Sequence, residues 1–372
     1  MNDSTDFPVL ELTGTPRDRG RVHGEVLRDR IHEMVERWKQ DIGDDTGMNP
    51  DDFLSQLVGE TRFLPAVKRW TPDLLEEVEG IAEGANVDFT AIFARQLSDE
   101  EPWFRLEKKL GLSWDSAAQC TAIGVNPQGE RPALAAQNMD TPAYYNGFQV
   151  LLHIKYPESP LEVFMFTIAG KINLAGLNNA PVGICCNTVL ALNYAKDGLP
   201  EDFVVRGALA RPSLAEALAF MHRIRHASGQ NYLIGGPERV ISLECSANQI
   251  VEFVPYPGAN RTYHTNHPLV NDDQTIHQER LAAMTNTQRE RWGFYANSHA
   301  RLDTLQRHLN DPDECITIDK IKTILSSHDG PVCHNSATKI SLGCLIMELS
   351  PNPTLHLAAG PPCSTPFTTY RF

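Results

Sequence analysis

The sequence lacks the features that mark nucleic-acid-binding, membrane-spanning and secreted proteins. Its 372 residues include 33 Lys and Arg but 47 Asp and Glu, which gives a formal net charge of −14. Nucleic acid and anionic membrane surfaces call for clustered Lys and Arg, so neither is expected as a partner. No run approaches the ~18 consecutive apolar residues of a membrane span. The first residues, MNDSTDFPVLELTG, have neither the basic nor the apolar stretch of a secretory signal. The sequence therefore predicts a cytoplasmic protein.

Cysteine is sparse, and the motifs that most often mark enzyme sites are absent. The eight cysteines are scattered apart from the pair Cys185-Cys186, and none forms a CxxC motif. In a long chain without a secretory signal, such cysteines are more often small buried hydrophobic residues than disulfide partners. There is no GxGxxG, Walker loop, GxSxG or HExxH, and the histidines of His264-Thr-Asn-His267 lack a third ligand nearby. No metal or cofactor is expected.

The order of the hydrophobic patterns predicts an α+β protein. Up to about residue 115 the apolar residues recur at helical spacing, which predicts helices over 18–42, 72–85 and 89–97. From about Ala118, β-rich runs alternate with turn signals, which predicts strands at 120–125, 133–136, 148–154, 162–167, 182–186, 230–235, 240–245, 249–254, 340–349 and 354–359. Between them we expect helices over 213–226, 274–291, 299–309 and 318–326. This order is typical of antiparallel sheets covered by helices.

A candidate catalytic corner lies where the character of the sequence changes. A strand that begins at Cys120 turns at Asn126–Gly129 and returns, so that Gln137–Asp140 are expected level with the cysteine. A thiol at the start of a strand, facing Asn and Asp side chains, is suited to nucleophilic catalysis. The same pattern also fits a buried cysteine on an ordinary hairpin.

Seven short sequence blocks, spread from about residue 10 to residue 370, carry a family resemblance. They are LELTGTPRDRG with His23-Gly24, Ile81-Ala-Glu-Gly84-Ala, Cys120-Thr-Ala, Gln137-Asn-Met-Asp140, Gly176-Leu-Asn178, Tyr263-His-Thr-Asn-His267 and Gly360-Pro-Pro. Each block alone is a weak signal, whereas the ordered set is specific. The set is similar to that of the penicillin acyltransferases (acyl-CoA:6-aminopenicillanic acid acyltransferases), which belong to the N-terminal-nucleophile (Ntn) hydrolases.

The resemblance implies a four-layer αββα sandwich made as a precursor that cuts itself before the nucleophile. Residues 1–119 would then form a helical α-chain, and residues 120–372 a β-chain that begins with Cys120. The two chains would stay associated as one composite domain.

Such a cut also makes the chemistry coherent. A freed α-amino group has an ordinary pKa of about 7.7–8.0, so it can take the thiol proton near neutral pH. Nucleophile and base then come from one residue, and no histidine partner is needed. The acyl group of a small amide or thioester would move to sulfur and then to water or an amine. An acyl-CoA is therefore retained as a co-substrate.

The resemblance also implies roles for four further residues. Asp140 matches the acidic residue that orients the Cys120 amine, although an Asp at the end of a strand often only caps a turn. Asn266 matches the residue that donates its side-chain amide to the oxyanion. Asn178 stands where related amidases supply a second donor, although an Asn after Gly-Leu is also a common turn residue. Asn138 is a supporting candidate.

Two departures from the family pattern stand out. Gln119 replaces the glycine that precedes the nucleophile in the family, and glycine there would relieve steric strain at the scissile bond. Self-cleavage is therefore expected to be slower or absent. The family also has an arginine near the start of the late strand, where this sequence has Thr338-Lys339. Lys339 would supply the charge but not the planar fork.

Two other functions remain open on these residues. One is an uncut, catalytically silent homologue that binds a small ligand or a partner, which Gln119 favours. The other is a papain-like Cys/His enzyme, for which His264 and His267 are the candidate bases. If the chain is an enzyme, four aromatic residues are candidates to line an acyl pocket: Trp103, Phe104, Tyr144 and Tyr145.

Overall fold

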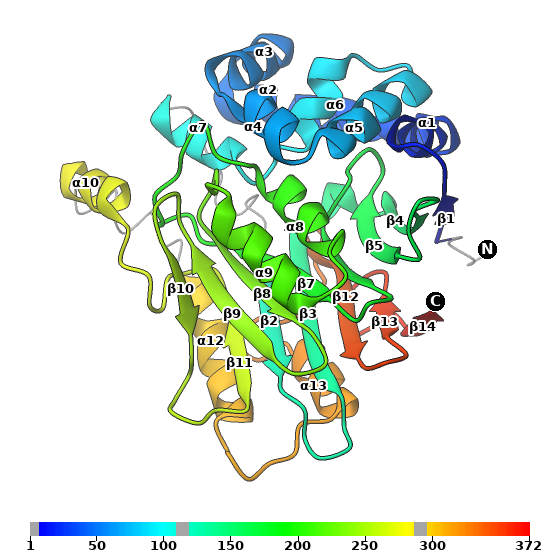
Figure 1. Cartoon of the computed structure of the whole chain (residues 1–372). Helices are drawn as coiled ribbons and strands as arrows, with labels where there is room; N and C mark the ends of the chain where they lie inside the picture. Colours follow the sequence, from blue (N-terminus) through cyan, green and yellow to red (C-terminus); the bar gives the residue numbers. More distant parts are fainter. Residues whose placement is uncertain (1–6, 109–118, 286–295) are drawn as a thin grey trace.

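Two β-sheets lie face to face between two layers of helices (Figure 1). The structure, a computed structural model, describes residues 7–108, 119–285 and 296–372. The predicted α+β class and the four-layer αββα arrangement are confirmed. Within the described part of the chain, no helix combines the length and the apolar character that crossing a membrane requires.

The larger sheet draws strands from both sides of the predicted chain division. Its order is β1 (Val9–Leu12), β4 (Gln149–Lys155), β5 (Glu162–Ile168), β6 (Ala175–Asn178), β7 (Gly183–Thr188), β8 (Gln230–Gly235), β9 (Val240–Cys245) and β10 (Ile250–Phe253). β1 runs parallel to β4, and the other neighbours are antiparallel. The N-terminal segment is therefore part of the sheet itself and does not form a separate helical unit.

The smaller sheet is antiparallel throughout and carries the candidate nucleophile. Its order is β11 (Arg261–His264), β2 (Gln119–Val125), β3 (Ala133–Pro142), β12 (Lys339–Leu349), β13 (Thr354–Ala358) and β14 (Thr368–Arg371). The predicted hairpin is present, because Cys120 pairs with Met139 and Gln119 pairs with Asp140. Gln137–Asp140 therefore lie level with the cysteine, as expected.

Most helices cover the outer face of the larger sheet. They are α1 (Pro16–Val26), α2 (Arg28–Thr46), α3 (Pro50–Glu60), α4 (Phe63–Trp70), α5 (Pro72–Ala85), α6 (Phe89–Arg95), α7 (Glu101–Glu107), α8 (Glu201–Leu209) and α9 (Leu214–Arg223). α12 (Ala296–Leu309) and α13 (Ile318–Leu325) cover the smaller sheet, and α10 (Thr275–Ala283) lies at the side of the molecule (Figure 1). A short 3-10 helix spans Ala143–Tyr145.

Two expectations about helices were wrong in detail. The helix expected over 18–42 is two helices, α1 and α2, which are separated at Leu27. Of the helix expected over 274–291, residues 275–283 are helical, and residues 286–291 lie outside the described part of the chain.

Helices α1 and α5 pack with almost no side chain between them. A Cβ atom on Gly20 would lie 1.9 Å from the Glu77 carbonyl oxygen, and one on Gly84 would lie 2.1 Å from the Arg21 carbonyl oxygen. Any larger residue would force the two backbones apart. Gly20 and Gly84 belong to the sequence blocks that carry the family resemblance, and these two glycines serve packing.

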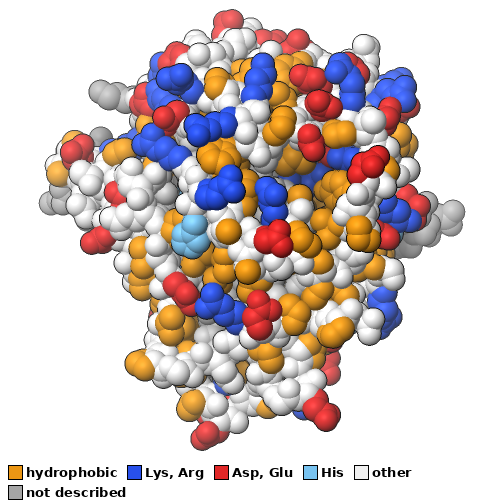
Figure 2. All heavy atoms as spheres, viewed as in Figure 1, with side chains coloured by type: hydrophobic (Ala, Val, Ile, Leu, Met, Phe, Trp, Pro, Cys, Tyr) orange, Lys and Arg blue, Asp and Glu red, His pale blue; other side chains and the backbone are white. Residues whose placement is uncertain are grey.

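The surface carries charges of both signs. In the face drawn in Figure 2, acidic and basic side chains are interspersed over the helical upper part, with apolar side chains between them. The space between the two sheets is apolar, and the Cys120 side chain belongs to that inter-sheet core.

Candidate active site

Two distant segments meet at the backbone of Cys120. β11 pairs with β2 so that His264 lies opposite Ala122. Two residues further along, antiparallel pairing brings Asn266 level with Cys120. Asn266 Oδ1 accepts a hydrogen bond from Cys120 N at 2.9 Å, and Asn266 Nδ2 donates to the Thr188 carbonyl at 3.1 Å. The structure thus brings Asn266 to Cys120, with the amide oxygen of Asn266 facing the backbone of the candidate nucleophile.

Arg301 on α12 also holds the Cys120 backbone, and the sequence patterns did not point to it. Its side chain is fully buried, and Nη2 donates to Asn266 Oδ1 at 2.7 Å. Nη1 donates to the Cys120 carbonyl at 2.5 Å and to Thr121 Oγ1 at 3.0 Å. Arg301 lies four residues before the buried Leu305. A lone charge within the apolar stripe of this helix was therefore the signal in the sequence.

The surroundings of the Cys120 thiol favour its neutral form. It lies between the sheets and is 9% exposed. Burial raises its pKa well above the usual range, and the carboxylates of Asp140 and Asp99 raise this pKa further, whereas the Arg301 charge opposes them. A buried thiol near carboxylates holds its proton at neutral pH. A base close to the sulfur is therefore needed before it can act as a nucleophile.

Asp140 is buried beside Cys120 on the neighbouring strand. Its Oδ1 accepts a hydrogen bond from Ser341 Oγ at 2.5 Å, and its Oδ2 lies 4.0 Å from His334 Nε2. Burial raises the pKa of Asp140 to about 6, although Arg301, Ser341 and Lys339 act in the opposite direction. The charge of Lys339 therefore acts on Asp140, and Lys339 stands near the position where the family has an arginine.

The structure does not bring Asn178 to Cys120. Asn178 ends β6, and its backbone N–H donates to the Val182 carbonyl. Among the described residues, its side chain bonds to backbone groups at the end of α8 and in the turn before β7. Val182 precedes β7, whereas Thr188, which contacts Asn266, ends β7. Six residues of a strand span about 20 Å. The expectation that Asn178 lies at the site is therefore corrected: its side chain fastens a turn.

Asn138 and Gln119 lie next to Cys120 on the hairpin of β2 and β3. Asn138 Nδ2 donates to the carbonyls of Leu325 and Val332 at 2.7 and 2.9 Å, which fastens the loop after α13. Gln119 is buried, and its side-chain oxygen has no hydrogen-bond partner among the residues that the structure describes. Asn138 therefore supports the hairpin, and Gln119 lies within the regular ladder between β2 and β3.

The two histidines that were candidate bases are engaged with other side chains. His264 Nε2 lies 2.8 Å from Glu244 Oε1, and both groups are fully buried. His267 Nδ1 lies 2.7 Å from Ser298 Oγ, and Ser298 Oγ also accepts from the Asn266 backbone N–H at 2.8 Å. These contacts hold the segment that carries Asn266 in place.

A cavity of about 120 Å³ lies beside this corner, beneath the N-terminal helices. Thr141, the residue after Asp140, lines it, and so does Asp99, whose charge acts on the Cys120 thiol. Its apolar wall includes the expected Tyr144 and Tyr145. The other two expected aromatic residues, Trp103 and Phe104, border a different and much smaller cavity.

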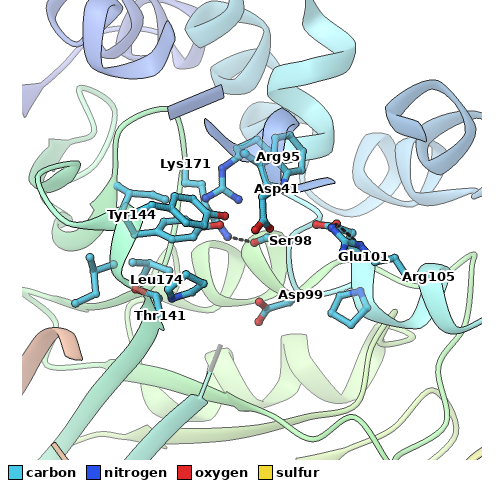
Figure 3. A pocket seen from close by; sticks show the side chains of 16 residues that line it. Asp41, Arg95, Ser98, Asp99, Glu101, Arg105, Thr141, Tyr144, Lys171 and Leu174 are labelled. Atoms are coloured by element: carbon cyan, nitrogen blue, oxygen red, sulfur yellow. Dashed lines mark hydrogen bonds and ion pairs between the residues drawn. The ribbon is translucent and has the colours of Figure 1, made fainter. Parts of the chain in front are cut away.

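Arg95 has an unusual environment in this cavity. Its guanidinium stacks on the rings of Trp38 and Tyr145, 5.1 Å from each centroid, and the side chain is 1% exposed. Within the described part of the chain, Nε and Nη1 have no hydrogen-bond partner. Figure 3 shows Arg95 converging with Asp41 and Tyr144 on the space above Asp99. A buried charge with unpaired donors is costly, so an anion in this cavity would relieve the cost.

Behind the cavity lies a buried acidic cluster. Burial raises the pKa of Glu100 to about 8 and that of Glu201 well above its usual range. Neighbouring carboxylates raise both pKa values further. Lys171 supplies one positive charge through an ion pair of 3.1 Å with Asp202. Donor atoms of Asp99, Cys186 and Glu201 lie within 4.8 Å of one another, as a metal site would need. However, burial favours the protonated form of Glu201, which is a poor ligand, and Lys171 already supplies a cation.

Comparisons with known proteins identify a family and a curated relative. The model of the family described as acyl-coenzyme A:6-aminopenicillanic acid acyl-transferase matches residues 127–339, which is more than half of the chain. The acyl-coenzyme A:6-aminopenicillanic-acid-acyltransferase 40 kDa form of Emericella nidulans is 28% identical over 267 residues, covering 71% of this chain and 70% of that protein.

Two solved structures each align over 68% of this chain with a TM-score of 0.39. One is a mutant of conjugated bile acid hydrolase from Clostridium perfringens, at 13% identity over 97% of that chain. The other is penicillin V acylase from Agrobacterium tumefaciens, at 8% identity over 85% of that chain. On the family match across more than half of its length, the chain belongs to the acyl-coenzyme A:6-aminopenicillanic acid acyl-transferase family.

Proposed function

We propose that this chain is a self-activating amidohydrolase or acyltransferase in which Cys120, freed as an N-terminal residue, carries the acyl group. The observation that carries this proposal is the hydrogen bond from Cys120 N to Asn266 Oδ1. In most structures a strand residue directs its N–H to the neighbouring strand. Here a side chain receives this N–H, which suits a nitrogen that must stay in place after its peptide bond is cut.

The cut itself needs only groups of this corner and water. Cys120 Sγ adds to the Gln119 carbonyl carbon, and the carbon–nitrogen bond breaks as the Cys120 nitrogen takes a proton. Water then hydrolyses the resulting thioester. A Gln119 carboxylate and a Cys120 amine remain. Arg301 and Asn266 hold the two ends of the Cys120 backbone and would limit its movement during these steps.

The freed amine then acts as the base. It takes the thiol proton, Sγ attacks the carbonyl carbon of the substrate, and the leaving amine departs with a proton. Water or an acceptor amine resolves the thioester. An acyl-CoA thioester would load the same sulfur. Asp140, buried beside Cys120, would hold the ammonium form of the amine, which also explains why an acid is kept where burial raises its pKa.

Two side-chain amides support an oxyanion-binding role in this proposal. Asn266 Nδ2 carries two hydrogens, of which the Thr188 carbonyl takes one. Asn187 Nδ2 is buried without a hydrogen-bond partner among the described residues. Asn187 lies two residues after Cys185, a member of the inter-sheet core that includes Cys120, so both side chains face the same space. We therefore assign to Asn187 the second donor role that the sequence suggested for Asn178.

The cavity beside the corner indicates the kind of substrate. Tyr144, Tyr145 and Trp38 give it an aromatic wall, and Arg95 offers unpaired N–H donors. A planar guanidinium suits a carboxylate, which it can bind through two parallel hydrogen bonds. We therefore propose small amides that bear an acidic group. The relative from Emericella nidulans, named for its action on 6-aminopenicillanic acid, is consistent with this class.

The intact mass of the denatured protein, measured beside a Cys120→Ala variant, tests the proposal. We expect pieces corresponding to 1–119 and 120–372 in the wild type and one chain in the variant. The cut protein should then release amine from an N-acyl amino acid, whereas the variant should not.

The competing function is an uncut homologue that only binds a ligand, which Gln119 favours. It predicts a single chain in both proteins and no amine release. That pair of results would overturn the proposal, because the strand would then hold Cys120 merely as a buried residue.

A further inference from the structure

A second group of reactive side chains lies outside the candidate active site. Its residues come from the loop between α13 and β12 and from the turn between β13 and β14. His328 follows α13, Cys333 lies in the loop before β12, and Cys363 lies in the turn between β13 and β14. One ligand atom from each lies within 4.8 Å of the other two. All eight cysteines are free in the structure, so the two sulfurs are thiols in contact range and not a disulfide.

The surroundings already orient these three groups. His328 Nδ1 donates a hydrogen bond to the Cys333 carbonyl at 3.0 Å, which leaves Nε2 as the ring nitrogen with a free lone pair. A metal-binding histidine commonly donates its other N–H to a backbone carbonyl in this way. Asn335 Nδ2 donates to Cys363 Sγ at 3.6 Å, as N–H groups do around metal-bound thiolates.

The segments that carry the group are anchored by backbone hydrogen bonds. Cys333 N donates to the Ser327 carbonyl at 2.8 Å, and the Val332 carbonyl accepts from Asn138 Nδ2 at 2.9 Å. Residues 361–365 form a turn in which the Pro361 carbonyl accepts two backbone N–H groups. Two fixed segments therefore meet at the group, while His328 and Cys363 remain exposed to solvent.

We propose that His328, Cys333 and Cys363 form a site for a thiophilic divalent cation, with Zn²⁺ as the best match. Zn²⁺ binds sulfur at about 2.3 Å and histidine nitrogen at about 2.0–2.1 Å, so two tetrahedral sulfur ligands stand about 3.8 Å apart. The ligand atoms lie within 4.8 Å of one another, so they would need to move only slightly closer to reach this geometry. Binding converts both thiols to thiolates and releases two protons, which leaves a neutral site. Water completes the fourth position on the exposed side.

The site would fasten the C-terminal turn to the loop before β12. That loop continues into His334, whose backbone N–H donates to Ser341 Oγ at 3.0 Å, and Ser341 Oγ donates to Asp140. The cation would therefore stabilise the surroundings of the candidate active site without touching the reacting atoms.

Cobalt titration of the reduced, metal-free full-length protein tests the site. Co²⁺ bound to thiolates gives a sulfur-to-metal charge-transfer band. We expect one Co²⁺ per chain, displacement by one equivalent of Zn²⁺, and a higher melting temperature with Zn²⁺. Cys363→Ser and His328→Ala change exposed residues, so they should fold, lose the band and lose the thermal shift. Cys315→Ser removes an exposed cysteine outside the group and should keep both.

Three outcomes would overturn the inference. The first is a wild-type protein without the charge-transfer band. The second is a band that survives Cys363→Ser, which would assign the metal to other thiols such as Cys120. The third is a protein isolated without reductant that is two hydrogens lighter and has lost two reactive thiols, since Cys333 and Cys363 would then form a disulfide.

Discussion

Asn266 Oδ1 accepts a hydrogen bond from the backbone nitrogen of Cys120 at 2.9 Å, across 146 residues of sequence. The contact exists because the short strand β11 pairs with β2 and the chain continues past its end by two residues. Arg301 then fixes the orientation of the Asn266 amide, since a guanidinium N–H can point only to the amide oxygen. The backbone of the candidate nucleophile is thus held by side chains from two other segments.

Replacing Arg301 by lysine should slow the formation of the two chain fragments by roughly 100-fold. A lysine cannot reach the Cys120 carbonyl, Thr121 Oγ1 and Asn266 Oδ1 together, and small displacements of reacting groups have effects of this size. The measurement is a time course of intact mass. Arg307→Lys, at an exposed ion pair with Asp329 on the same helix, is the control.

Processing of Arg301→Lys at the wild-type rate would contradict the role of this residue. A separate measurement covers a chain that is not cut. Arg301→Met leaves the buried Cys120 carbonyl without its partner, so the free energy of unfolding should fall by about 1–3 kcal/mol.

Arg95 and Arg105 should respond in opposite ways to replacement by methionine. Both line the cavity, but Arg105 pairs with Asp45 at 3.0 Å and with Glu101, whereas Arg95 has unpaired donors. Breaking a buried ion pair costs about 3–5 kcal/mol, so Arg105→Met should be strongly destabilised. Arg95→Met should keep or raise the free energy of unfolding, because it removes a desolvated charge.

The same Arg95→Met variant tests substrate recognition. The wild type should favour an N-acyl amino acid over its carboxamide, and the variant should lose most of that preference, by about 10- to 100-fold in kcat/KM. An equal preference in both proteins would show that the carboxylate binds elsewhere. Urea unfolding curves provide the stability comparison.

Glu100 should make a contribution to stability that falls as the pH rises. Its pKa is about 8 in the folded protein, against an ordinary value of 4.5. Below pH 4.5 the carboxyl is protonated in both states. Between pH 4.5 and 8 only the folded state keeps the proton, so its contribution to stability decreases as pH rises through this window and then stays constant.

Glu100→Gln should remove much of this dependence. The glutamine side chain can still accept the hydrogen bonds from Ser228 Oγ and Glu201 N, and the amide carries no charge. We expect the variant to be more stable than the wild type at about pH 8.5 and nearly equal at about pH 4.5, by urea unfolding at both values. Glu76→Gln, at an exposed position, is the control. Parallel curves for the wild type and Glu100→Gln would contradict the prediction.

Adding one methyl group to the contact between α1 and α5 should be costly. The Cβ of Gly84→Ala would lie 2.1 Å from the Arg21 carbonyl oxygen, so the helices must separate, at about 1–3 kcal/mol. Gly59→Ala on α3 meets nothing within 4 Å and should gain about 0.5–1 kcal/mol from helix propensity. The melting temperatures of the two variants should therefore move in opposite directions.

The fold class and the hairpin that carries the candidate site could be predicted without any coordinates. Alternation of apolar residues and turn residues such as Asn126–Gly129 specify a hairpin locally, so the pairing of Cys120 and Gln119 with Met139 and Asp140 was predictable. The strands β8 and β9 were predicted with their observed bounds for the same reason. The short strands β1, β6, β11 and β14 carry too few residues for a pattern and were missed.

Which distant side chains reach Cys120 depends on how the elements pack together. Asn178 and Asn266 were both candidate donors in the sequence. In the structure, Asn178 lies about 20 Å along the sheet from Cys120, whereas Asn266 bonds to Cys120. Arg301 and Arg95 were hidden in ordinary helices. Their roles depend on which sheet face or cavity each helix covers, and that depends on burial and pairing between segments far apart in the chain. The periodicity of residues within one segment carries no information about those contacts.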